Sequence, residues 1–249
     1  MAGGLRHTFE MQLTGLQHTL IRMGSSVEEM LDTAMRALTG QDLELAQRVI
    51  EADDYVDGLD LEIEHDCMRL LALQQPMSSD LRTIGAALKI IADIERIADY
   101  AVDIAKIVRR LADEPYRLNL GQIPQMGEVT SRMVHTALQA YVRRDLDLVM
   151  QVVEDDDLVD DLEDQLFTEL LAAMQQDASL VRRAALLLFV ARYLERCADH
   201  AVNVAERVYY METGVLKQLA ASHKEDQKHE ASGADLLLNN LNPEAQRAE

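Results

Sequence analysis

Apolar residues recur at intervals of three and four along most of the 249-residue chain, which is the spacing of one face of an α-helix. The pattern pauses at short polar segments, at residues 39–42, 74–80, 143–146 and 175–180, and for longer at residues 112–127. Prolines, which break helices, stand only at positions 76, 115, 124 and 243. The chain is therefore predicted to be all-α.

The chain also repeats itself. Residues 30–60 align without a gap with residues 133–163, and the segment ERIADYAVDIA (95–105) returns as ERCADHAVNVA (195–205). Two copies of one three-helix unit explain this most simply. We expect two tandem three-helix bundles with six long helices, divided into a first repeat at 1–113, a linker at 114–126, a second repeat at 127–214 and a flexible, acidic and polar tail at 215–249.

The composition indicates in which compartment the protein folds and works. A hydrophobic content of 48% is enough for a core, and the two cysteines, Cys67 and Cys197, are too few for a disulfide framework. The amino terminus lacks the sections of a signal peptide, and the longest apolar run, at 184–191, is much shorter than a membrane span. These features predict a soluble, cytoplasmic protein with reduced thiols.

The charge restricts the partners. The chain carries 44 acidic and 24 basic residues, a net charge of −20, which would repel a nucleic-acid backbone. Nucleic acid is therefore excluded as a partner. The remaining interpretations are an acidic solvated surface, a surface for a basic partner protein, and a site that collects cations.

Acidic side chains spaced four apart lie on one helix face, and the chain has four such pairs: Asp53 with Asp57, Glu95 with Asp99, Asp156 with Asp160, and Glu195 with Asp199. When each hairpin folds about its turn, the first pair comes level with the second and the third with the fourth. The sequence thus predicts one cluster of four carboxylates in each repeat.

Like charges at this spacing cost about 0.2–0.5 kcal/mol per pair, so something should compensate them. The candidates are a metal that prefers oxygen ligands, because no Cys or His stands in the clusters, and neighbouring arginines such as Arg96 and Arg196. Asp103 and Asn203 extend the pairs by a turn and are weaker candidate ligands, because they differ between the copies. A wet acidic face without metal is the alternative.

Catalysis leaves no trace in the sequence. Glu62 and His65 have the Glu-x-x-His spacing of a di-iron bundle, but the second copy has no such histidine, so we treat the spacing as coincidence. Glycine-rich phosphate loops, nucleophile elbows and Cys/His metal spacings are absent. We expect no enzyme and no catalytic residue.

The duplicated repeat, its Glu/Asp-x-x-x-Asp pairs and the preceding QQPMSSDLR closely resemble the PhoU family, from about residue 9 to about Gly214. The resemblance implies a cytoplasmic, often homodimeric regulator that works beside the phosphate ABC transporter and its sensor histidine kinase, and keeps the phosphate-starvation regulon off when phosphate is plentiful. It also implies multinuclear iron or zinc on the eight carboxylates named above.

Three functional hypotheses follow. The first is an adaptor that binds the nucleotide-binding subunit of the transporter and the kinase. The second is a metal-dependent enzyme or metal store that uses the same carboxylates. The third is a helical scaffold without metal.

Overall fold

The computed structural model describes residues 2–74, 76–112 and 120–220. Within them the chain forms six α-helices and one short 3-10 helix, η1, and no strand: α1 (Ala2–Gly40), α2 (Leu43–Gln74), α3 (Ser78–Leu111), α4 (Ile123–Arg143), α5 (Leu146–Gln176), η1 (Ala178–Leu180) and α6 (Val181–Thr213). The predicted all-α fold of two tandem three-helix bundles is confirmed.

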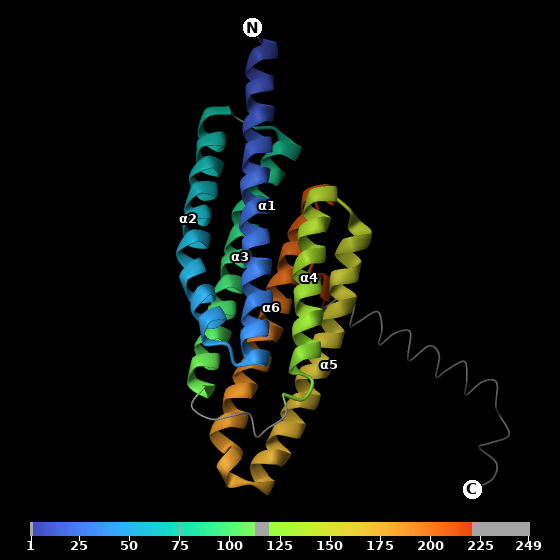
Figure 1. Cartoon of the computed structure of the whole chain (residues 1–249). Coiled ribbons are helices and arrows are strands. Elements are labelled where there is room, and N and C mark those ends of the chain that lie inside the picture. The colour runs from blue at the N-terminus through green and yellow to red at the C-terminus, as the bar shows by residue number, and fades with distance from the viewer. Residues whose placement is uncertain (1, 75, 113–119, 221–249) are drawn as a thin grey trace, which may run out of the picture.

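The six helices form two bundles that lie side by side (Figure 1). Helix α2 packs only on α1 and α3, and α5 only on α4, α6 and η1, among the described helices. The bundles meet where α3 contacts α6 and where α1 contacts α4. Helices α2 and α5 therefore lie on the outside, and each presents one face to solvent.

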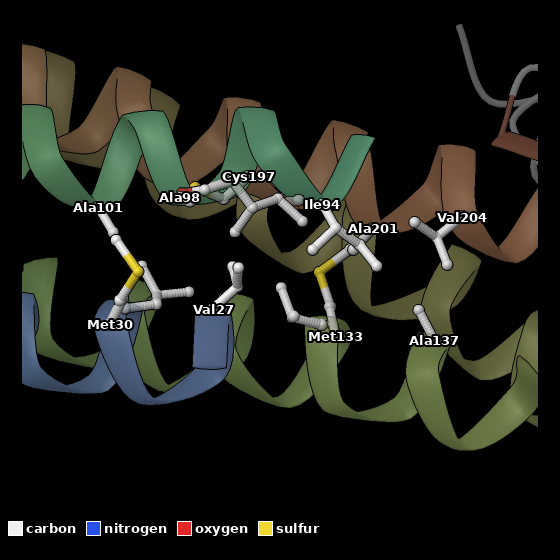
Figure 2. Close-up of a cluster of buried hydrophobic side chains, with 14 of the residues drawn as sticks. Val27, Met30, Ile94, Ala98, Ala101, Met133, Ala137, Cys197, Ala201 and Val204 are labelled. Atoms are coloured by element: carbon white, nitrogen blue, oxygen red, sulfur yellow. The ribbon is translucent and has the colours of Figure 1, made fainter. Parts of the chain in front are cut away.

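One layer of the core lies between the α1–α4 pair and the α3–α6 pair, and α2 and α5 add buried side chains such as Val56 and Leu166. Figure 2 shows Met30 of α1 pointing toward Ala101 of α3, and Met133 of α4 pointing toward Ala201 of α6. All four side chains are buried. Small residues on α3 and α6 let the helices approach closely, and the methionines fill the irregular space that remains.

The turns confirm the duplication in detail. Gln41 and Arg144, at equivalent positions, both adopt a positive φ, of 51° and 56°. The next residue then caps a helix: Asp42 accepts hydrogen bonds from the backbone N–H groups of Glu44 and Leu45, and Asp145 does the same for α5. Carboxylates at this position satisfy N–H groups that have no partner in the helix.

The second pair of turns differs between the copies. Met77 is the N-cap residue of α3, which begins at Ser78, and no side chain caps this helix. In the second repeat the side chain of Asp177 accepts a hydrogen bond from the N–H of Ser179 and so caps η1, whereas α6 itself has Leu180 as its N-cap residue and no side-chain cap.

The predicted domain boundaries stay a prediction. Helix α4 begins at Ile123, inside the segment 114–126 expected as a linker, and residues 114–119 lie outside the described residues. Of the predicted tail, residues 215–220 are described and 221–249 are not. Among the described helices, none combines the length and the apolar character needed to cross a membrane.

Candidate metal centres

The first carboxylate cluster lies where α2 and α3 face each other. On α2, Val56 and Leu59 turn inward to the core, which leaves Asp53 and Asp57 at the edge of the contact with α3. Burial, and after it the charges of Asp57 and Asp99, raise the pKa of Asp53. The structure therefore brings carboxylates of both helices close enough to repel one another.

Glu95 belongs to the same cluster. Burial, and after it the charge of Asp99, raises its pKa, and Asp60 and Asp57 add smaller contributions. Arg96 opposes these effects, since its Nε lies 3.6 Å from Glu95 Oε2 and its Nη1 lies 2.8 Å from Asp99 Oδ2. Arg96 thus compensates part of the repulsion, and an arginine is one of the two candidates that the sequence left open.

The second cluster is more deeply buried. Asp156 is 5% exposed and Glu195 is 9% exposed, whereas Asp160 is half-buried and Asp199 is exposed. Burial, and after it the charge of Asp199, raises the pKa of Glu195 to about 7, with smaller contributions from Glu163 and Asp160. At neutral pH this carboxyl therefore carries a proton part of the time.

One oxygen of Glu195 has no partner. Arg192 Nη1 lies 2.7 Å from Glu195 Oε1 and 3.6 Å from Glu163 Oε1, but Glu195 Oε2 is buried and accepts no hydrogen bond from the described residues. A buried oxygen of this kind is costly unless a proton or a cation satisfies it.

The arginine that pairs with the second cluster is Arg192, and not the candidate Arg196. Arg196 instead contacts Tyr100 of the first repeat. Its guanidinium carbon lies 5.7 Å from the ring centre of Tyr100, and its Nη1 donates to the Tyr100 hydroxyl at 3.5 Å.

The weaker candidate ligands have other contacts. Asp103 accepts a hydrogen bond from Lys106 Nζ at 2.9 Å, and Asn203 Nδ2 donates to Asp93 Oδ1 at 3.2 Å. Asn203 therefore lies at the α3–α6 contact between the repeats. Glu62 and His65 also take separate contacts: Glu62 pairs with Arg22 at 3.2 Å, and His65 lies 3.7 Å from Asp66.

Two carboxylates were missed by the sequence reasoning. Asp60 and Glu163, at equivalent positions of α2 and α5, add negative charge next to Glu95 and Glu195. The signal was available, because both copies carry an acid three residues after Asp57 and Asp160.

The donor chemistry fits a cation that prefers oxygen ligands, and the partnerless Glu195 Oε2 supports that fit. The ligands are not gathered into a ready cage, since within the described residues no three His, Cys, Asp or Glu side chains are grouped tightly enough to hold a metal ion. Metal binding by the eight predicted residues thus stays a prediction.

Known proteins with similar sequences belong to one family. The family model described as PhoU domain matches the chain twice, at residues 20–108 and 123–208. A phosphate-specific transport system accessory protein PhoU homolog of Clostridium acetobutylicum is 42% identical over 84% of this chain and 96% of its own length. The phosphate-specific transport system accessory protein PhoU of Escherichia coli is 32% identical, over 83% and 86%.

Solved structures agree. The crystal structure of PhoU from Pseudomonas aeruginosa superposes with a TM-score of 0.81 at 35% identity, covering 83% of this chain and all of that one. The phosphate transport system regulatory protein PhoU from Streptococcus pneumoniae gives a TM-score of 0.79 at 31% identity, covering 84% and 99%.

Proposed function

The chain belongs to the PhoU family, and from this premise we propose that it is an accessory protein of phosphate-specific transport. In this role it is a cytoplasmic, homodimeric regulator that binds the nucleotide-binding subunit of the phosphate ABC transporter and a phosphate-sensing histidine kinase. It holds the phosphate-starvation genes off when phosphate is plentiful. The match of both repeats to one family model is the observation that carries the proposal.

A rigid, acidic helical body suits an adaptor. Between α1 and α4 lies a groove of about 840 Å³, with Glu29, Asp32 and Glu128 on its walls and all three side chains exposed. Because charge complementarity speeds encounter and selects partners, this groove supports docking of a basic surface. Catalysis has no part in the proposal, and the named relatives are accessory proteins.

We include a metal in the proposal. Iron or zinc would be held by Asp53, Asp57, Glu95 and Asp99 in the first repeat and by Asp156, Asp160, Glu195 and Asp199 in the second. The metal would supply positive charge where burial and repulsion now raise carboxyl pKa values. Asp60 and Glu163 would orient these ligands or join them.

A genetic experiment tests the regulatory role. Deleting the gene should switch on alkaline phosphatase in phosphate-rich medium, and the wild-type gene should restore repression. A Glu29→Lys/Glu128→Lys variant, with both changes at exposed positions, should express normally and fail to restore it. Unchanged reporter activity in the deletion strain would remove the regulatory proposal, and full repression by the charge-reversal variant would remove the groove from it.

A further inference from the structure

A second groove, of about 640 Å³, lies between α5 and α6 and is apolar. Its walls include Phe167, Leu188 and Phe189, with Glu163 and Arg192 at the edge. Phe167 and Phe189 are 55% and 54% exposed, and the chain has only three phenylalanines. Aromatic side chains gathered in this way mark a surface that gains stability when it is covered.

The fold itself does not require this surface. In the first repeat, the positions equivalent to Phe167 and Phe189 are Glu64 and Lys89. The same hairpin therefore folds with charged residues at these places. The phenylalanines of the second repeat need another explanation, and a docked segment provides one.

We propose that the groove is covered by the chain's own carboxyl-terminal segment, residues 236–241, with the sequence LLLNNL. Its leucines, at 236, 237, 238 and 241, are the only large apolar residues in 221–249. This proposal goes beyond the function proposed above and does not depend on it.

The path of the chain after α6 favours this occupant. Helix α6 ends at Thr213, yet Leu219 is only 4% exposed and its N–H donates to Glu206 Oε1 at 2.7 Å. The chain has therefore turned back along α6. Since Glu206, Asp199 and Arg192 follow one another at seven-residue intervals, Glu206 projects from the same side of α6 as the groove edge.

The length of chain suffices. At 1.5 Å per residue, Leu188 lies about 27 Å along α6 from Glu206. The 17 residues that follow Ala220, up to and including Leu237, span up to about 56 Å when extended. A tethered segment has an effective concentration in the millimolar range, which favours it over a second copy or another protein supplied at lower concentration.

Disulfide trapping in the full chain tests the proposal. Ala185→Cys places a thiol in the groove, and Leu237→Cys places one in the segment while three leucines remain. The matched control combines Gly85→Cys with Leu237→Cys, because Gly85 is the equivalent position of the first repeat, is also half-buried, and has open space for a Cβ atom. Native Cys67 and Cys197 are buried, and burial raises the pKa of Cys67 to about 12, so neither should exchange.

The control is stringent because Gly85 lies closer than Ala185 to the end of α6, from which the carboxyl-terminal segment extends. Arg82, three residues before it, donates to the carbonyl of Met211 at 3.3 Å. A tail without a preferred site should therefore reach position 85 at least as readily as position 185. Docking predicts an intramolecular disulfide that forms about tenfold faster at position 185.

A further variant, Phe167→Glu/Phe189→Lys, replaces the two phenylalanines by the residues of the first repeat. It should reduce the rate of disulfide formation at position 185 to the rate measured at position 85. Equal rates at both positions, or no effect of this variant, would overturn the proposal. A disulfide-linked dimer would indicate that a second copy of the chain occupies the groove. Absence of any cross-link at position 185 would indicate that another protein occupies it. Either result also overturns docking of the segment.

Discussion

His200 of α6 lies with its Nδ1 2.8 Å from Asp93 Oδ1 of α3, so this hydrogen-bonded pair joins the two repeats. In the other repeat, the position equivalent to Asp93 is Tyr193 and the position equivalent to His200 is Tyr100. The rings of these two tyrosines stack with their centres 5.7 Å apart. One contact of the internal duplication is therefore polar and its counterpart is aromatic. The two halves have diverged at the surface where they meet.

Removing the polar contact should loosen the junction. Because Asp93 and His200 are both half-buried, we expect His200→Ala to lower the free energy of unfolding by about 1 kcal/mol in urea denaturation. His65→Ala, at a side chain that is 77% exposed, is the control and should change it by less than about 0.5 kcal/mol.

A double-mutant cycle with Asp93→Ala isolates the pair. Asp93 also accepts from Asn203, so the aspartate change alone should cost more than the histidine change. The effects should not add, since the second change removes a bond that the first has already broken. Strict additivity would show that the two residues do not stabilise the junction together.

Two glycines at equivalent positions mark the other contact between the repeats, α1 against α4. A Cβ atom on Gly24 would lie 2.6 Å from Leu138 Cδ1, and one on Gly127 would lie 2.5 Å from Met35 Cε. Leu138 is branched and 7% exposed, whereas Met35 is unbranched, half-buried and on the wall of the α1–α4 groove. The same added methyl group therefore meets a stiff neighbour in one case and a compliant one in the other.

We accordingly expect Gly24→Ala to destabilise the protein by about 1–2 kcal/mol, because overpacking forces Leu138 to move. Gly127→Ala should cost less than Gly24→Ala, since the flexible Met35 side chain, whose Cγ and Sδ would lie 3.1 and 3.2 Å from the new Cβ, can shift, and alanine favours the helix by about 0.5–1 kcal/mol. Chemical denaturation of both variants measures the difference. Equal losses would mean that the two contacts are equally rigid.

The sequence predicted the bundles and the approach of the carboxylates because both depend on periodicity within one hairpin. Asp53 and Asp99 are equally far from the turn between α2 and α3, so they are predicted to lie at the same height in the hairpin. The structure brings these two side chains close together. The different roles of Arg192 and Arg196 could not be read in this way. Tyr100, which attracts Arg196, comes from the other repeat, and contacts between repeats leave no mark in the spacing of either one.

The pKa of Glu195 makes stability depend on pH. Its value in the folded protein, about 7, lies above the ordinary 4.5, so the folded state binds the proton more tightly than the unfolded state. Stability contributed by the protonated form is therefore full below about pH 4.5 and is lost as the pH rises through 7. In metal-free protein, Glu195→Gln should remove this loss.

We expect the Gln variant to be more stable than wild type at pH 8 by roughly 1–3 kcal/mol, and equally stable at pH 4 within about 0.5 kcal/mol. Urea denaturation in the presence of a chelator measures both. Glu95→Gln is the matched control: the pKa of Glu95 is also raised, but its side chain is 29% exposed, so the gain should have the same sign and be smaller. A wild-type stability that does not fall between pH 5 and 8 would contradict the assignment.

The metal proposal makes a prediction for Asp57 and Asp160, which occupy equivalent positions of the two clusters. Protein purified without chelators or a metal-affinity tag should contain iron or zinc by elemental analysis. The Asp57→Ala/Asp160→Ala variant should contain little, and added metal should raise the melting temperature of wild type but not of the variant. Glu51→Ala/Glu154→Ala, at equivalent exposed positions, removes the same charge and should retain the metal.

The metal-free scaffold predicts the opposite pattern, because without a cation the two aspartates only add repulsion. In that case wild type would contain no more metal than either variant, and Asp57→Ala/Asp160→Ala would be as stable as wild type or more stable at every metal concentration. The two explanations differ in the sign of the change in melting temperature on loss of the aspartates in the presence of metal. A stabilised double variant would therefore remove the metal from the proposed function and leave Arg96 and Arg192 as the cations that compensate the clusters.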